Sequence, residues 1–90
     1  MKLKQGFELR EICGERVVIG TGIANIDFSK LINLNETAGF LWKAAERLGA
    51  FTSHDLADEL CKEYEVEPAA ALHDVEEMLM DWAKLGLLEE

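Results

Sequence analysis

The feature that most constrains this chain is a change of hydrophobic period at Asn35. Residues 30–34 mix apolar and polar side chains in a short run, which is typical of a half-buried or edge strand. Beyond Asn35, apolar residues recur at the spacing of one helix face, namely Ala38, Leu41, Trp42, Ala45 and Leu48. Asn35 is a favourable N-cap, and Glu36 suits the positive end of a helix dipole. The pattern therefore predicts a strand that runs directly into a helix over about 36–48, ending at Gly49.

Two further strands are expected before this junction. Residues 7–13 alternate imperfectly between apolar and polar, and residues 16–19 are β-branched and more apolar, which predicts an antiparallel pair with Gly14-Glu15 as its turn. We expect the third strand over about 27–34, while the pairing of residues 20–28 stays open. In a three-stranded sheet one outer strand leaves backbone groups unpaired, and we expect residues 29–33 to form that edge.

Two more helices are predicted after the first. Thr52 and Asp55 form a variant of the capping box, and Phe51 can pack against Leu56 as a hydrophobic staple. Pro68 suits the first turn of the last helix, and Gly86 suits its end, with Leu87 folding back on Trp82. The expected fold class is α+β, with three antiparallel strands followed by three helices that cover one face of the sheet. Trp42 and Trp82 are the expected anchors between helices and sheet.

Length and charge restrict the class of protein. Ninety residues predict a single domain over 1–90, and 49% hydrophobic with 30% charged residues is typical of a globular protein. There is no apolar run of roughly 20 residues and no signal-peptide core, so we expect a cytoplasmic protein that does not bind membranes. Residues 1–50 carry seven Lys/Arg and six Asp/Glu (+1), whereas residues 51–90 carry two and twelve (−10). This acidic half disfavours nucleic acid as a partner.

The sequence holds no convincing catalytic or metal-binding constellation. Cys13 and Cys61 are expected to be apolar core residues, and with the two histidines they lack the close spacing of a zinc site. His73 and Asp74 are helix neighbours that do not face each other. The glycine-containing segment at 20–22 lacks the lysine and the following helix of a phosphate-binding loop. We therefore expect no catalytic residues, no cofactor and no metal.

The chain resembles a known family, and the segment at 34–42 carries the most specific part of the resemblance. The Leu-Asn-Glu-Thr-Ala run at 34–38, followed by Leu41-Trp42 and by the helix patterns up to Leu88, resembles the PqqD family across nearly the whole chain. That family comprises coenzyme PQQ synthesis protein D and related recognition elements of ribosomally made, modified peptides (RiPPs). The resemblance implies a winged-helix-like domain that binds a precursor leader peptide as an added strand and presents it to a modifying enzyme, of the radical SAM type in PQQ synthesis.

The resemblance also implies a site. Carried over to this sequence, the peptide cleft would lie between the third strand and the third helix, formed by Lys30, Leu31, Ile32, Asn33, Leu72, Val75, Glu76 and Leu79. The acidic third helix suggests a leader with basic residues beside its apolar anchors, and so a salt-sensitive affinity.

Two alternative functions stay open from the sequence. The architecture is shared with winged-helix DNA-binding proteins, although residues 67–84 carry five acids and one lysine, the wrong sign for a recognition helix. The other alternative is a regulatory subunit that docks on an enzyme without binding its substrate. The particular precursor, the particular modifying enzyme and the oligomeric state are not indicated by the sequence.

Overall fold

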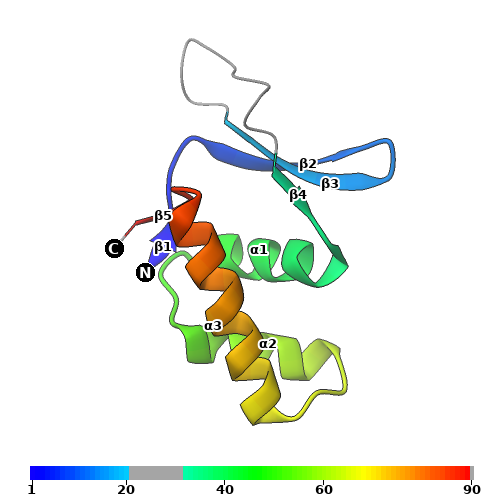
Figure 1. Cartoon of the computed structure of the whole chain (residues 1–90), viewed down its shortest axis with the longest axis vertical. Helices are drawn as coiled ribbons and strands as arrows, with labels where there is room; N and C mark the ends of the chain where they lie inside the picture. Colours follow the sequence, from blue (N-terminus) through cyan, green and yellow to red (C-terminus); the bar gives the residue numbers. More distant parts are fainter. Residues whose placement is uncertain (21–31, 90) are drawn as a thin grey trace.

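A computed structural model describes residues 1–20 and 32–89 of the chain. The elements, in order, are β1 (Lys2–Leu3), β2 (Phe7–Ile12), β3 (Glu15–Gly20), β4 (Ile32–Leu34), α1 (Glu36–Leu48), α2 (Ser53–Glu63), α3 (Pro68–Lys84) and β5 (Leu88–Glu89). Strands β2, β3 and β4 form an antiparallel sheet in that spatial order, with α1 next to it and α2 beyond (Figure 1). The predicted α+β fold, a three-stranded sheet followed by three helices, is confirmed.

The hairpin between β2 and β3 turns one residue earlier than predicted. Ile12 pairs with Glu15, so the two turn residues are Cys13 and Gly14. Both have positive φ, 54° and 79°, as a type I′ turn requires. The expected Gly14-Glu15 turn was therefore wrong, and so was the expectation that Cys13 is a core residue, because its place at the tip of the hairpin exposes it to solvent.

Strand β4 is shorter in the described structure than the predicted third strand. It pairs with β3 through Val18 and Ile32 at one end and Arg16 and Leu34 at the other. The remainder of the prediction, residues 27–31, lies outside the described residues.

The transition from β4 into α1 is stabilised by the predicted cap. Asn35 has extended backbone angles, and its Oδ1 accepts a hydrogen bond from the Ala38 N–H at 2.7 Å. The helix begins one residue after the cap and ends before Gly49, whose φ is 75°. The predicted strand-to-helix junction at Asn35 and the predicted end of α1 at Gly49 are thus both confirmed.

Local signals also define α2 and α3. The capping box is present in both directions, from Asp55 N–H to Thr52 Oγ1 and from Thr52 N–H to Asp55 Oδ2. At the end of α3, Gly86 N–H donates to Ala83 O and Leu87 N–H to Trp82 O, the hydrogen-bond pair of a Schellman motif. Gly86 has the positive φ, 79°, that this motif needs.

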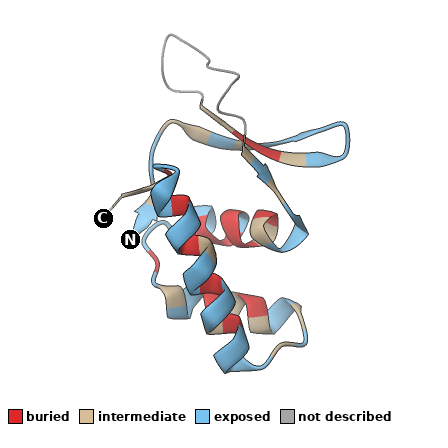
Figure 2. Ribbon diagram, viewed as in Figure 1, coloured by how far each residue is buried: buried red, intermediate tan, exposed pale blue. Residues whose placement is uncertain are grey.

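The core lies where the three helices meet the sheet. Trp42 on α1 and Trp82 on α3 are 1% and 2% exposed, and their rings pack edge to face with centroids 5.2 Å apart. The buried faces of α1, α2 and α3 point toward one another (Figure 2). On the sheet, Val18 joins the buried cluster, and Leu9, Ile32 and Leu34 pack against it. The two tryptophans therefore link α1 to α3 beneath β4.

The sequence analysis missed a second, two-stranded sheet. Strand β1 pairs with β5 through Lys2 with Glu89 and Leu3 with Leu88. The Met1 amino group and the Phe51 carbonyl, 2.9 Å apart, tie this pair to the loop before α2. No helix in the described part of the chain is long and apolar enough to span a bilayer.

Candidate functional site

A groove of about 370 Å³ lies between β4 and α3. We call it the β4–α3 groove. Its floor includes the partly buried Ile32 and Leu34. Its opposite wall is formed by residues 74–82 of α3 together with Leu85. The described residues that line it are Ile32, Asn33, Leu34, Asn35, Ala38, Asp74, Glu77, Met78, Asp81, Trp82 and Leu85.

The strand side of this groove offers unpaired backbone groups. Ile12 and Glu15 close a two-residue turn, so they form a hydrogen-bonded pair, and paired and unpaired positions alternate along an antiparallel ladder. Val17 therefore directs its backbone N–H and C=O toward β2, and the flanking residues of β3 direct theirs toward β4. On β4, this alternation leaves Asn33, opposite Val17, with its N–H and C=O directed away from β3. No other strand of the described part of the chain pairs with that edge.

The helix side of the groove carries two parallel stripes of side chains. Met78, Trp82 and Leu85 form an apolar stripe, in which Met78 is half-buried, Trp82 is buried and Leu85 is exposed. Asp74, Glu77 and Asp81 form an acidic stripe beside it, and all three are exposed. The groove thus combines an open strand edge, an apolar floor and a negatively charged wall.

The structure places the predicted site residues in three different surroundings. Ile32 and Asn33 line the groove as expected, whereas Lys30 and Leu31 lie outside the described residues. The four residues predicted from the third helix do not line it. Val75 and Leu79 are buried in the core at 0% and 5% exposure, Leu72 faces the start of α3 and α2, and Glu76 faces away from β4.

The reason for this difference is the rotation of α3. Successive helical residues are about 100° apart, so Val75 and Leu79 lie on the side that meets α1 and α2, and Glu76 lies roughly opposite the groove. The apolar period of the sequence identified the core stripe of α3, and the groove stripe is next to it. In the sequence, Met78 and Leu85 are apolar residues seven positions apart outside the core stripe, which indicates that a second stripe exists but not which stripe faces β4.

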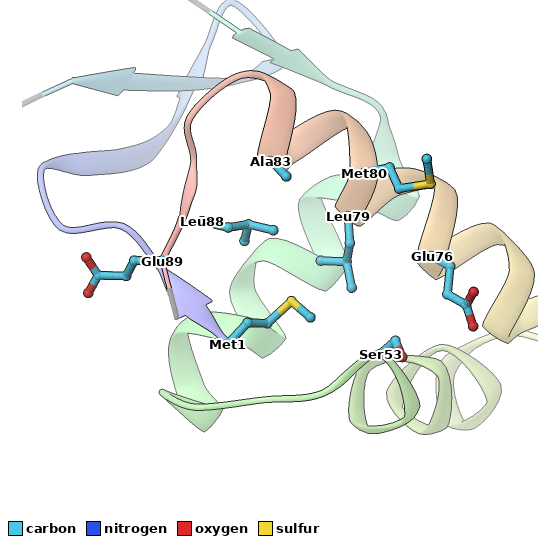
Figure 3. A pocket seen from close by; sticks show the side chains of 8 residues that line it. All are labelled: Met1, Ser53, Glu76, Leu79, Met80, Ala83, Leu88 and Glu89. Atoms are coloured by element: carbon cyan, nitrogen blue, oxygen red, sulfur yellow. The ribbon is translucent and has the colours of Figure 1, made fainter.

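A second hollow, of about 530 Å³, lies on the other side of α3 (Figure 3). Apolar side chains from α3, β5 and the chain start point into it, with Met80 60% exposed. Its polar residues are Ser53, Glu76 and Glu89, which come from three different elements. The hollow is therefore suited to an apolar side chain.

One group of side chains has the donor atoms of a metal site. His73, Asp74 and Glu77 have ligand atoms within 4.8 Å of one another, and all three residues are exposed. His73 Nδ1 lies 3.9 Å from Asp74 Oδ1, and His73 Nε2 lies 3.7 Å from Glu77 Oε1. The imidazole is thus within ion-pair distance of both carboxylates. Exposed acidic groups of this kind are common without an ion.

Comparison with known proteins places the chain in a family. A family model described as "Coenzyme PQQ synthesis protein D (PqqD)" matches residues 20–88, which include the β4–α1 junction and the whole of α3. The chain belongs to the PqqD family. The resemblance drawn from the sequence is thereby confirmed, and both sides of the groove fall within the matched region. A search of curated proteins found no match.

The chain is also similar to a solved structure described as TbiB1 in complex with the TbiA(beta) leader peptide. The two share 21% sequence identity with a TM-score of 0.76, over 99% of this chain and 95% of that one. At this identity the similarity establishes a common fold. In the solved structure, a protein of that fold holds a leader peptide.

Proposed function

We propose that this PqqD-family protein binds the leader of a ribosomally made precursor peptide and presents it to a modifying enzyme, without catalysing a reaction itself. The observation that carries the proposal is the outward-facing backbone of Asn33 beside the β4–α3 groove. An extended peptide can complete such an edge with main-chain hydrogen bonds while alternate side chains enter the groove. Family membership and the leader peptide bound to TbiB1 support the same reading.

The sheet has a second outer strand, and β4 is the better acceptor. Strand β2 carries an exposed ion pair between Glu8 and Arg10 at 2.8 Å, and charged side chains on an edge discourage strand addition. Strand β4 instead has apolar residues on its helix side and a groove next to it. We therefore assign the leader to β4, where it would contact the backbone of Asn33 and the side chains of Ile32, Met78, Asp81 and Leu85.

The test uses a proline to remove one backbone donor from this edge. Because the Asn33 N–H faces away from β3, Asn33→Pro deletes the outward donor and leaves the β3–β4 ladder in place. A labelled synthetic leader of a precursor encoded beside this gene is titrated with the full chain, and binding is followed by fluorescence anisotropy. We expect Asn33→Pro to weaken binding roughly tenfold or more.

Two variants control for indirect effects. Asn33→Ala keeps the N–H and changes only the exposed side chain, so binding is expected to stay within about twofold. Glu11→Pro makes the same backbone change on β2, where the ladder also directs the N–H outward, and should leave binding intact. Equal losses for Glu11→Pro and Asn33→Pro, or no loss for either, would exclude strand addition at β4.

The partner enzyme and the compartment belong to the same proposal. We propose a radical SAM enzyme as the modifying partner, by extension from PQQ synthesis, and the cytoplasm as the location. Free Cys13, exposed at the hairpin tip, and Cys61, half-buried on α2, suit a reducing compartment. Leader-dependent modification by the enzyme encoded nearby should require this chain and fail with Asn33→Pro.

A further inference from the structure

The wall of the β4–α3 groove carries negative charge that no cation among the described lining residues compensates. Of the described residues that line it, Asp74, Glu77 and Asp81 are charged, and all are acids. Glu77 and Asp74 have side chains 68% and 66% exposed, and the group within 4 Å of them is His73, which is charged only if protonated. An unfilled groove therefore presents a negative potential to whatever enters it.

The acidic stripe is long enough to meet more than one side chain of an added strand. Asp74 and Asp81 are seven residues apart on α3, which corresponds to about 10.5 Å along the helix axis. In a strand, side chains on one face recur about every 6.6–6.8 Å, so the stripe spans two or three positions of the peptide face turned toward α3. Positions that place an apolar side chain against Met78 and Leu85 are therefore close to positions that meet a carboxylate.

Lysine and arginine suit this combination of surfaces. Their methylene stems can pack on the apolar stripe while the charged group reaches the acidic stripe in water. A glutamate or aspartate at the same position of the peptide would meet carboxylates of like charge, so the groove disfavours acidic peptides. Because the acids are exposed, the attraction needs no costly burial of charge.

We propose that the groove selects leader segments in which lysine or arginine alternates with apolar residues on the peptide face turned toward α3. This inference rests on the proposed function and specifies the class of peptide that the site accepts. The apolar residues supply contact with Met78, Trp82 and Leu85, and the basic residues read Asp74, Glu77 and Asp81.

The experiment needs no knowledge of the natural precursor. A displayed library of random 12-residue peptides is selected against the full chain, and the enriched peptides are synthesised with a fluorescent label. We expect them to contain more Lys/Arg than Asp/Glu at positions alternating with apolar residues. Their affinity should fall several-fold between 0.05 and 0.5 M NaCl, since salt screens exposed charges.

Variants of equal net charge separate the groove from the general acidity of the chain. The triple change Asp74→Asn, Glu77→Gln and Asp81→Asn removes three groove charges and should weaken binding roughly tenfold, the combined effect of three exposed ion pairs. The control triple Glu63→Gln, Glu65→Gln and Glu76→Gln removes three exposed charges that do not line the groove. We expect less than about a twofold effect from it.

The outcomes distinguish this inference from the proposed function. Peptides that lose affinity with Asn33→Pro but show no basic preference, or respond equally to both triples, would overturn the charge selection and leave strand addition in place. A selection in which no peptide responds to Asn33→Pro would overturn the proposed function itself. Basic peptides sensitive to the groove triple and to Asn33→Pro support both.

Discussion

At the scale of single residues, the β4–α1 junction concentrates several tasks in few positions. Asn33 turns its backbone outward, Leu34 packs against the core, and Asn35 caps the helix and lines the groove. Strand and helix are separated by the cap alone, so the edge that we propose as the peptide acceptor is held by the first turn of α1. Local hydrogen bonding at Asn35 thus supports the position of the groove.

Asn35→Ala tests this role. The substitution removes the acceptor of the 2.7 Å bond from Ala38 N–H, and we expect the free energy of unfolding to fall by about 1 kcal/mol. Urea denaturation measures it, with Asn33→Ala as a matched control expected to change stability by less than about 0.5 kcal/mol. Equal effects at both positions would contradict the capping role.

These residue-scale features were the ones best predicted from sequence. The Asn35 cap, the Thr52/Asp55 capping box and the Gly86 end of α3 all depend on neighbours within a few residues, so local chemistry determines them. The hairpin turn was displaced by one residue because Cys13 adopts a positive φ, which non-glycine residues rarely do. A local rule fails there because the two-residue turn geometry outweighs the preference of that residue.

At the scale of elements, the close approach of α1 to the sheet depends on a missing side chain. Gly39 is buried in the first turn of α1, and a Cβ at this position would overlap Cδ of Arg16 on β3 and lie 3.2 Å from its Nε. The Arg16 side chain therefore lies against α1 at Gly39, and its backbone pairs with Leu34, one of the residues that line the groove. Glycine allows α1 to approach the strand at the cost of helix propensity.

A double-mutant cycle measures this contact. In an Arg16→Ala background, Gly39→Ala has room for its methyl group and should stabilise the fold by about 0.5–1 kcal/mol through helix propensity. In the wild-type background the same change displaces the arginine, so we expect a gain smaller by roughly 0.5 kcal/mol or more, or a loss. Identical effects in both backgrounds, by urea denaturation, would show that the contact is unimportant.

The candidate site was only half predictable at this scale. Ile32 and Asn33 could be assigned because a strand has two edges and few residues. On α3, the core stripe with Val75 and Leu79 and the groove stripe with Met78 and Leu85 both contain apolar residues at helical spacing. Which stripe faces β4 depends on how α3 packs on α1, and a single sequence carries no signal for that rotation.

At the scale of the whole molecule, the dominant property is the unequal distribution of charge. The net charge is −9, and residues 51–90, which contain α2 and α3, account for a sum of −10. Charges of one sign packed into two adjacent helices repel each other and destabilise the folded state. The groove acids are part of this excess.

Salt should therefore stabilise the protein. We expect Tm to rise by about 2–5 °C between 0.02 and 0.3 M NaCl, measured by circular dichroism, since the Debye length shrinks below the spacing of these helices' charges. The control triple at Glu63, Glu65 and Glu76 should start from a higher Tm and gain less from salt. A Tm that falls with salt would indicate that ion pairs such as Arg47 with Glu59, at 2.8 Å, outweigh the repulsion.

The pairing of β1 with β5 is the whole-molecule feature that sequence could not indicate, because it joins two-residue segments at opposite ends of the chain. It has a practical consequence. Residues 2–3 and 88–89 lie side by side (Figure 1). They border the hollow on the far side of α3 from the groove. A dye or tether attached to Lys2 or to Glu89 therefore leaves the molecule from the same place, so immobilisation at either residue keeps the groove accessible to a displayed library.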